Sequence, residues 1–158
     1  MDTKQNKGMV WGGSGIEKVV YDFIRSSVHD GGVIVELGAG HVSTKMLCEN
    51  YYLYSVEHNK EFLNLYKSNY IYAPIKDGWY DIEILKDELP GIHFQDLILI
   101  DGYDRKQILE HLYLFNPEAM YIIHDTYRDE EKQLAIDLGK ALKREAVFHT
   151  DGDYWATI

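Results

Sequence analysis

The stretch VIVELGAGHVSTKMLCEN, residues 33–50, opens with residues suited to a buried strand, breaks into a Gly-x-Gly turn and resumes in a helical pattern. In an open α/β sheet, ligands bind beyond the carboxyl ends of the strands, where the strand order reverses. Gly38 and Gly40 allow the backbone to turn tightly and to approach a ligand, because neither residue carries a Cβ. A helix that begins near Ser43 would present free N–H groups to an anion. The stretch therefore predicts a ligand site at the end of a strand.

Strands and helices alternate on both sides of this stretch. Runs of β-branched and aromatic residues predict strands at 33–37, 52–56, 70–75, 97–100, 120–123, 146–149 and 154–158. Helical spacing predicts helices at about 43–49, 60–67, 105–115 and 128–144, after a first helix that begins near residue 14. The helix starts carry capping signatures: Ser14 with Glu17, Asp104 with Gln107, and Thr126 with Asp129.

The last two predicted strands are joined by Thr-Asp-Gly-Asp, which is a hairpin signal. Strands separated by helices indicate a parallel sheet that is covered on both faces. We therefore expect an α/β fold, with a Rossmann-like, mainly parallel sheet of seven strands, helices on both faces and a C-terminal antiparallel hairpin.

The composition is typical of a folded domain with an acidic surface: 46% of the 158 residues are hydrophobic, and the formal net charge is −10. Phosphate backbones repel such a surface, so we expect no nucleic-acid partner. No apolar run approaches the roughly 20 residues that span a bilayer, so we expect no membrane partner. The N-terminal residues lack the apolar core of a signal peptide, and the single cysteine, Cys48, agrees with a reducing compartment. We expect a cytoplasmic protein with a mobile segment at 1–13 and one domain at 14–158.

Two acidic residues flank the glycine turn. Glu36 precedes the turn, and Glu57 ends the next predicted strand, where a carboxylate can accept hydrogen bonds from both hydroxyl groups of a ribose. Dinucleotide sites and S-adenosylmethionine sites share this arrangement, but the dehydrogenase fingerprint has Gly or Ala where this chain has Ser43. Each carboxylate also has an alternative role: Glu57 could cap the next helix together with His58 and Asn59, and Glu36 could be a solvated strand end.

The pattern acidic-x-Gly-x-Gly, here ELGAG at 36–40, resembles motif I of the class I S-adenosylmethionine-dependent methyltransferases. YSVEHNKEFL at 54–63 resembles the ribose-binding second motif of that family. DLILIDGY at 96–103 resembles its fourth-strand motif, and MYIIHDTYRDEE at 120–131 resembles its fifth strand with the loop that follows. The resemblance extends over residues 14–158. GAGHVST, YAPIKDGWYD and LIDGYDR resemble the small members of the O-methyltransferase-like branch.

This resemblance implies the strand order 3-2-1-4-5-7-6 and a site for S-adenosylmethionine, with S-adenosylhomocysteine as the product. It also implies six cofactor-binding residues: Glu36 near the methionine amino group, the turn residues Gly38, Ala39 and Gly40, and Glu57 with His58 in the ribose motif.

Asp101 follows the apolar run DLILI and so lies at a carboxyl strand end, beside the proposed methyl group. In the family this position contacts the cofactor or the acceptor, so we assign Asp101 as the catalytic residue, able to take a proton from a hydroxyl acceptor. An Asx-turn is the alternative. His124 and Asp125 end the next strand near the same pocket, unless they only cap the last helix. Asp101 and Asp125 together suit Mg²⁺, but no third carboxylate ligand is identifiable, and we assign no metal ligands.

These features predict a methyltransferase that acts on a small-molecule acceptor, with O-methylation of a hydroxyl group expected. The Asp/Asn-Pro-Pro-Tyr motif of amino-methylating DNA enzymes is absent, since the corresponding residues 101–104 are DGYD. The pocket is expected to come from residues 1–13, from the loop at 76–80 and from the loops after Asp101 and Asp125. Five aromatic residues are expected at its rim, with simple packing as the alternative: Trp11, Trp79, Tyr80, Tyr103 and Tyr127.

Two further functions stay open on the sequence alone. One is a scaffold or sensor that binds S-adenosylmethionine without turnover. The other is an NAD-binding Rossmann oxidoreductase, which Ser43 and the terminal hairpin disfavour. The sequence leaves the oligomeric state and the identity of the acceptor undetermined.

Overall fold

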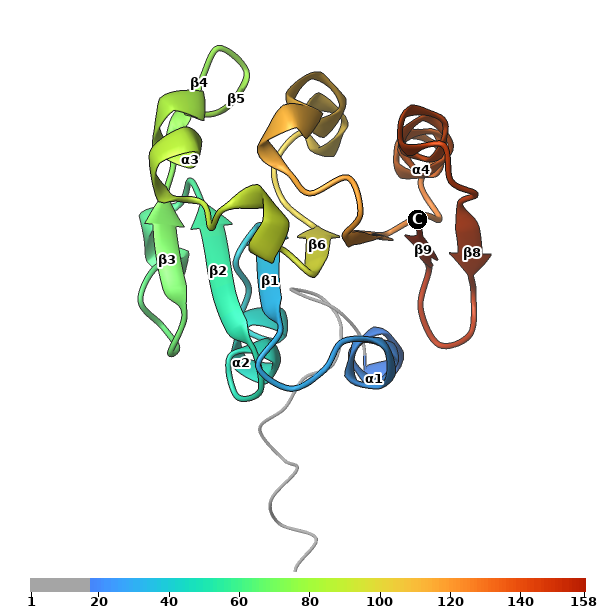
Figure 1. Cartoon of the computed structure of the whole chain (residues 1–158), viewed down its shortest axis with the longest axis horizontal. Coiled ribbons are helices and arrows are strands. Elements are labelled where there is room, and N and C mark those ends of the chain that lie inside the picture. The colour runs from blue at the N-terminus through green and yellow to red at the C-terminus, as the bar shows by residue number, and fades with distance from the viewer. Residues whose placement is uncertain (1–17) are drawn as a thin grey trace, which may run out of the picture.

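A seven-stranded sheet runs through the middle of the structure, a computed structural model that describes residues 18–158 (Figure 1). In spatial order the strands are β3 (Asn69–Tyr72), β2 (Tyr52–Glu57), β1 (Val33–Leu37), β6 (Leu97–Ile100), β7 (Met120–His124), β9 (Trp155–Thr157) and β8 (Val147–His149). The first five are parallel, and β9 is antiparallel to both β7 and β8. Counted along the chain, this order is 3-2-1-4-5-7-6, which confirms the predicted topology and the terminal hairpin.

Helices cover both faces of the sheet. Helices α1 (Lys18–Ser27) and α2 (Ser43–Leu47) pack on one face, and α3 (Ile82–Glu88), the 3-10 helix η3 (Arg105–Leu114) and α4 (Asp129–Leu142) pack on the other. Successive side chains of a strand point to opposite faces. In β1, Ile34 therefore belongs to the apolar cluster under α1 and α2, whereas Val35 and Leu37 belong to the cluster under α3, η3 and α4. Among residues 18–158 the structure has no helix that is both long and apolar enough to cross a membrane.

Several predicted element boundaries are wrong. The helix expected at 60–67 is reduced to the short 3-10 helix η1 (Lys60–Phe62), and Asn64 has a left-handed φ of 58°, which an α-helix cannot accommodate. The strand expected at 70–75 ends at Tyr72, and a separate small hairpin of β4 (Ile75–Lys76) and β5 (Trp79–Tyr80) follows. The expected mobile segment and the capping box at Ser14 lie outside the described residues.

The helix starts differ in part from their predicted caps. Asp104 is the N-cap residue of η3 and its side chain accepts from Gln107 Nε2 at 3.3 Å, so the predicted pair forms. Asp104 nevertheless has a left-handed φ of 38° and makes no side-chain cap to the backbone, and η3 is a 3-10 helix with non-helical backbone at His111. The N-cap residue of α4 is Arg128 and not Thr126. Helix α3 was not predicted, although the sequence carries its signal: Asp81 caps it by accepting from the Glu83 N–H at 3.1 Å. A further 3-10 turn, η2 (Ile92–Phe94), connects α3 to β6.

Candidate functional site

The carboxyl ends of β1, β6 and β7 meet at one edge of the sheet, and the loops that leave them enclose a cleft of about 390 Å³. This is the edge where ligands bind in open α/β sheets. The cleft is lined by Gly38, Ala39, Gly40, Phe62, Asp101, Arg105, His124, Asp125, Tyr127 and Arg128. Four predicted site residues, Gly38, Ala39, Gly40 and Asp101, are therefore brought together around one cavity.

The glycine turn is held to the sheet by backbone contacts. Gly38 has a φ of 100°, which L side chains rarely adopt, and its N–H donates to the Val56 carbonyl at 2.9 Å. A Cβ at Gly38 would lie 2.5 Å from the Cα of Gly102, in the loop after β6. The predicted tight turn is confirmed at Gly38. The close approach that requires glycine in this structure is to Gly102, whereas the sequence interpretation had assigned it to a ligand.

Glu36 is fully buried beneath the turn, so the alternative that it is a solvated strand end is wrong. Its Oε1 accepts hydrogen bonds from the hydroxyl groups of Thr44 and Ser55, and Thr44 Oγ1 in turn accepts from the Gly40 N–H at 2.9 Å. Ser55 is the direct neighbour of Glu36 on the adjacent strand. Burial raises the pKa of Glu36 to about 7, against the opposing effect of the Thr44 and Ser55 hydrogen bonds. The carboxyl group connects the turn to β2, and its role toward a cofactor stays a prediction.

Glu57, at the carboxyl end of β2, is also buried and contacts the same turn. Its Oε2 accepts from the Ala39 N–H at 3.1 Å, and its Oε1 accepts from the N–H groups of His58 and Asn59 at 2.8 and 2.7 Å. The capping of η1 is made by Asn59, whose side chain accepts from the Glu61 N–H. The alternative that Glu57 caps this helix together with His58 and Asn59 is therefore right in part. Asn59 is the N-cap and Glu57 binds the N–H groups of His58 and Asn59, but Glu57 also binds the turn after β1.

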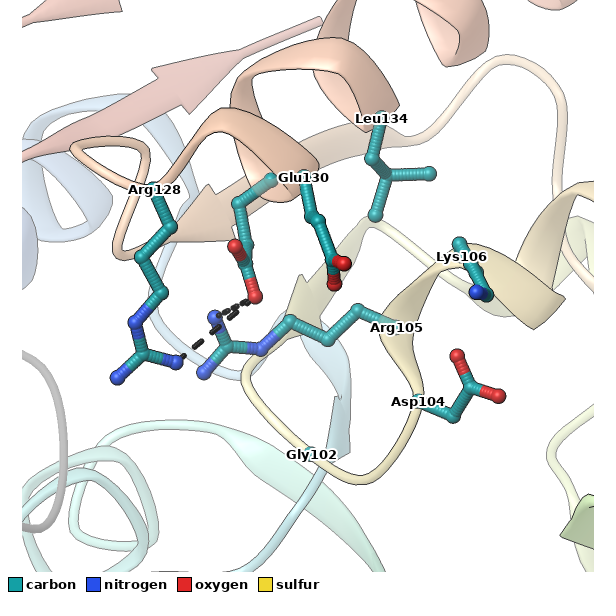
Figure 2. A pocket seen from close by; sticks show the side chains of 8 residues that line it. Gly102, Asp104, Arg105, Lys106, Arg128, Glu130 and Leu134 are labelled. Carbon is teal, nitrogen blue, oxygen red and sulfur yellow. Dashed lines mark hydrogen bonds and ion pairs between the residues drawn. The ribbon is translucent and has the colours of Figure 1, made fainter.

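A second, smaller cavity of about 230 Å³ lies next to the cleft, between the loop after β6 and the start of α4 (Figure 2). Arg105 and Arg128 line both cavities. Arg105 Nη1 lies 3.2 Å, and Arg128 Nη1 3.8 Å, from Oε1 of Glu131 in α4. The two arginines therefore form the boundary between the cleft and the outer cavity.

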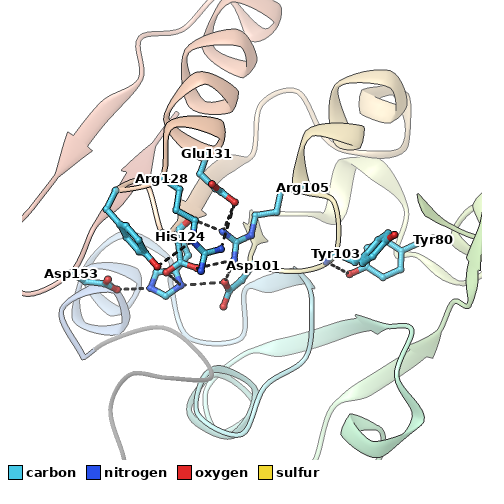
Figure 3. Close-up of polar contacts among 10 residues, drawn as sticks. Tyr80, Asp101, Tyr103, Arg105, His124, Arg128, Glu131 and Asp153 are labelled. Atoms are coloured by element: carbon cyan, nitrogen blue, oxygen red, sulfur yellow. Dashed lines mark hydrogen bonds and ion pairs between the residues drawn. The ribbon is translucent and has the colours of Figure 1, made fainter. Parts of the chain in front are cut away.

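A network of charged side chains forms the floor of the cleft (Figure 3). Arg105 Nη2 donates to Asp101 Oδ1 at 2.8 Å and to Asp125 Oδ2 at 3.0 Å. His124 Nδ1 lies 3.1 Å from Asp101 Oδ1, and its Nε2 lies 2.7 Å from Oδ2 of Asp153, in the turn of the terminal hairpin. Three segments that are distant in the sequence, 101–105, 124–125 and the hairpin turn at Asp153, thus meet through one set of ion pairs.

The surroundings of His124 favour its protonated form. Burial alone lowers the pKa of His124, but the hydrogen bond and charge of Asp101 and the charges of Asp125 and Asp153 outweigh it and raise the pKa to about 9. Because ionised carboxylates only accept hydrogen bonds, both ring nitrogens donate to them. The alternative that His124 only belongs to a helix cap is therefore wrong, since its ring joins two carboxylates.

The predicted rim residues divide into two groups. Tyr127 lines the cleft, and Tyr103 is exposed, with its ring 5.3 Å from that of His58. Trp79 and Tyr80 are buried in the core, so for them the packing alternative is right. Trp11 lies outside the described residues.

The sequence interpretation missed several residues of the site. Phe62 and Arg128 line the cleft, and Thr44, Ser55, Glu131 and Asp153 bind residues of the turn or of the ion network. Ser55 could have been found from the pairing of β1 with β2, which places it beside Glu36. Arg105, interpreted only as the start of a helix, is in fact the centre of the ion network.

No protein-family model matches this sequence, and neither does any curated protein. Solved structures do resemble the fold. Precorrin 8W decarboxylase from Methanobacterium thermoautotrophicum has a TM-score of 0.62 and 14% identity, over 93% of this chain and 91% of that chain. Precorrin-6y C5,15-methyltransferase from Geobacter metallireducens also has a TM-score of 0.62, with 16% identity over 89% of this chain and 87% of that one.

A third similar structure is the MycE methyltransferase of the mycinamycin biosynthetic pathway, which was solved in complex with Mg, S-adenosylhomocysteine and mycinamycin VI. It has a TM-score of 0.54 and 14% identity over 88% of this chain, which spans 44% of that larger one. At these identities the comparisons establish the fold. The described chain has the Rossmann-like fold of these proteins, with a seven-stranded, mainly parallel sheet that ends in an antiparallel hairpin.

Proposed function

We propose that this protein is an S-adenosylmethionine-dependent methyltransferase that acts on a small-molecule acceptor, with the oxygen of a hydroxyl group as the methylated atom. One observation carries the proposal: the glycine turn after β1 and the carboxylate at the end of β2 are joined directly, through Glu57 Oε2 and the Ala39 N–H. This unit opens onto a cleft that also contains Asp101. The similar structures that are named as methyltransferases, one of them a complex with S-adenosylhomocysteine, support the same function.

The residues at the edge of the sheet fit the proposed cofactor. A cleft of about 390 Å³ lies within the roughly 300–1,000 Å³ that is usual for small-molecule sites. Glu57 keeps acceptor capacity for ribose hydroxyl groups, because a carboxylate offers about four acceptor positions and three N–H groups bind it here. When bound, S-adenosylmethionine supplies an electrophilic methyl group on its sulfonium. The chain's own residues hold the turn, the ribose-binding carboxylate and the acceptor site in fixed relative positions, and such positioning accounts for much of the rate of a bimolecular transfer.

Asp101 is the proposed catalytic residue. Its contacts to Arg105 and His124 are both made by Oδ1, so a hydroxyl acceptor in the cleft would donate its hydrogen bond to Oδ2 and release its proton there. The acidic surface, with a formal net charge of −10, supports a small molecule over a nucleic acid. A carbon acceptor is the second candidate, because the name of the precorrin-6y relative refers to positions C5 and C15 of its substrate.

Calorimetric titration tests the cofactor. We expect S-adenosylmethionine and S-adenosylhomocysteine to bind and NAD not to bind. Glu57→Gln should weaken binding of both by about 1–3 kcal/mol, because the ribose hydroxyl groups lose a charged acceptor. Glu61→Gln is the matched control, since Glu61 is exposed in the next turn. Binding of NAD alone would contradict the proposal, and equal affinities of the two variants would remove Glu57 from the site.

A transfer assay separates an enzyme from a binding scaffold. The protein is incubated with S-adenosylmethionine that carries a labelled methyl group and with pooled metabolites, and the labelled products are identified by mass spectrometry. A product labelled on oxygen supports the proposal, and a product labelled on carbon supports the second candidate. Cofactor binding without any labelled product would favour the scaffold.

A further inference from the structure

The guanidinium group of Arg105 lies at the centre of three carboxylates (Figure 3). Nη2 binds Asp101 and Asp125, at the ends of β6 and β7, and Nη1 binds Glu131 in α4 at 3.2 Å. Nη1 also donates to the His124 carbonyl oxygen at 3.1 Å. Only 10% of the Arg105 side chain is exposed. A buried guanidinium with this many acceptors has its position fixed by the surrounding structure.

The same carboxylates would attract a divalent cation. Asp101, His124 and Asp125 each offer a ligand atom, and these atoms lie within 4.8 Å of one another. Carboxylates at neighbouring strand ends suit Mg²⁺ or Mn²⁺. The donors of the site nevertheless do not fit a metal. Both ring nitrogens of His124 are directed at carboxylates, which requires a proton on each and leaves no lone pair for an ion. One oxygen of each remaining carboxylate, Oδ1 of Asp101 and Oδ2 of Asp125, is already bound by Arg105 Nη2, which lies between the two groups.

We propose that Arg105 is the built-in cation of this site, a positioning residue whose guanidinium takes the place between Asp101 and Asp125 that a divalent cation would need. Arginine suits this role because its donors are planar, point in fixed directions and stay charged at any physiological pH. Asp101 is thereby held by Oδ1 at the wall of the cleft, without dependence on the concentration of any metal. The inference concerns the charge balance of the site and does not depend on which group the protein transfers.

The test is a gain of metal binding. Wild-type protein, Arg105→Ala and the matched control Arg128→Ala are titrated with MnCl₂, with free Mn²⁺ followed by electron paramagnetic resonance and thermal stability measured in parallel. Without Arg105 the three carboxylates lose the cation that they share, so we expect Arg105→Ala to bind Mn²⁺ with a Kd of about 10⁻⁴–10⁻³ M, as in weak oxygen-ligand sites. Its melting temperature should rise with the Mn²⁺ concentration by mass action. Adding Asp125→Asn to this variant should remove the effect.

The wild-type protein and Arg128→Ala should show neither effect. Arg128 is half exposed, and its nitrogens lie 3.7 and 3.8 Å from Asp125 and Glu131, so its loss leaves the guanidinium of Arg105 in place. Arg105→Lys keeps a charge and should also bind no Mn²⁺, which a merely structural role of Arg105 would not predict.

Two results would overturn the proposal. One is that the wild-type protein binds Mn²⁺ in the same concentration range and that Asp125→Asn abolishes this binding. The other is a folded Arg105→Ala variant, by circular dichroism, that binds no Mn²⁺. If that variant does not fold, Arg105→Gln takes its place, and the titration of the wild-type protein decides independently of any variant.

Discussion

Asp101 has two carboxylate oxygens in different environments. Oδ1 accepts from Arg105 Nη2 at 2.8 Å and from His124 Nδ1 at 3.1 Å, and neither of these contacts involves Oδ2. The Asp101 side chain also lines the cleft. Two cationic donors on one oxygen fix the rotation of the carboxylate, because each would lose a charge-assisted hydrogen bond if the group turned. One oxygen therefore fixes the side chain, and we expect the other to accept a hydrogen bond from an acceptor molecule.

Asp101→Asn tests this difference between the two oxygens. The donors of Arg105 and His124 will hold the amide oxygen in the place of Oδ1, which puts the NH₂ group where Oδ2 faces the acceptor. A proton acceptor becomes a donor, so turnover should fall by roughly 10²–10⁴-fold while cofactor affinity stays nearly unchanged. Turnover with saturating acceptor and cofactor affinity by calorimetry are the two measurements. Asp104→Asn, in the same loop but outside the cleft, is the control. Turnover equal to that of the wild type would leave Asp101 with a structural role.

The position of Asp101 could be predicted from the sequence, and its partners could not. An apolar run followed by Asp indicates a carboxyl strand end, because the run must be buried and the charge must lie where it stops. Arg105 follows four residues later, and its spacing was interpreted as an ordinary helix start. Its guanidinium reaches Asp125 and Glu131 only because η3, β7 and α4 are packed side by side. No local sequence pattern predicts such a contact between distant elements.

At the scale of the elements, the loops after β1 and β6 are in direct backbone contact. Gly38, with its φ of 100°, would bring a Cβ to 2.5 Å from the Cα and 2.8 Å from the N of Gly102. A Cβ at Gly102 would collide with the hydroxyl group of Tyr80 and approach the Leu37 carbonyl oxygen to 2.7 Å. Because neither residue has a side chain, the loops after β1 and β6 can leave the sheet in direct contact, at the edge where the cleft begins.

Gly38→Ala and Gly78→Ala separate backbone strain from this contact. Gly78 has a similar φ of 91°, and a Cβ there would meet nothing within 4 Å. Gly78→Ala should therefore cost only the strain of a left-handed backbone, about 1–2 kcal/mol. Gly38→Ala should cost about 1–3 kcal/mol more, because the backbone of the loop after β6 must move. Urea denaturation of both variants measures the difference in the free energy of unfolding, and equal losses would show that the contact is unimportant.

The sequence predicted elements correctly where strands are buried in the middle of the sheet. The strands at 33–37 and 97–100 are buried on both faces, so their apolar runs mark their extents. It failed on the surface. Asn64 adopts a left-handed backbone that ends η1 early, and neither the spacing nor the capping residues of 60–67 indicate this. Helix α3 was missed although its N-cap, Asp81, lies directly after the loop predicted at 76–80.

At the scale of the whole molecule, the terminal hairpin is part of the site. Asp153 lies in the turn between β8 and β9, and its Oδ2 is 2.7 Å from His124 Nε2 at the end of β7. The side chains of both residues are almost fully buried. The sequence predicted the hairpin and its antiparallel pairing, but not that its turn reaches the floor of the cleft. That contact follows from the pairing of β7 with β9, which brings residues 29 positions apart together.

The ion pairs of His124, with Asp101 first and with Asp125 and Asp153 as well, make the stability of the molecule depend on pH. The pKa of His124 rises from its ordinary 6.5 to about 9, so the native state binds the proton more tightly than the unfolded chain does. The stabilisation is complete below about pH 6.5 and is lost as the pH rises through about 9. The difference between the two pKa values, at about 1.4 kcal/mol per pH unit, gives an upper limit of about 3 kcal/mol.

Asp153→Asn should lower the pKa of His124, because one of the three carboxylates that favour the imidazolium, Asp101, Asp125 and Asp153, becomes neutral. Its loss of stability relative to the wild type should be largest below pH 6.5 and should shrink as the pH rises toward 10, where His124 is neutral in both proteins. Urea denaturation across this range, together with NMR titration of the imidazole, measures both quantities. Asp151→Asn is the control, since Asp151 is exposed in the same turn. If His124 of the wild-type protein titrates near 6.5, the ion pair does not form in solution, and Asp153 does not help to hold the hairpin to the sheet.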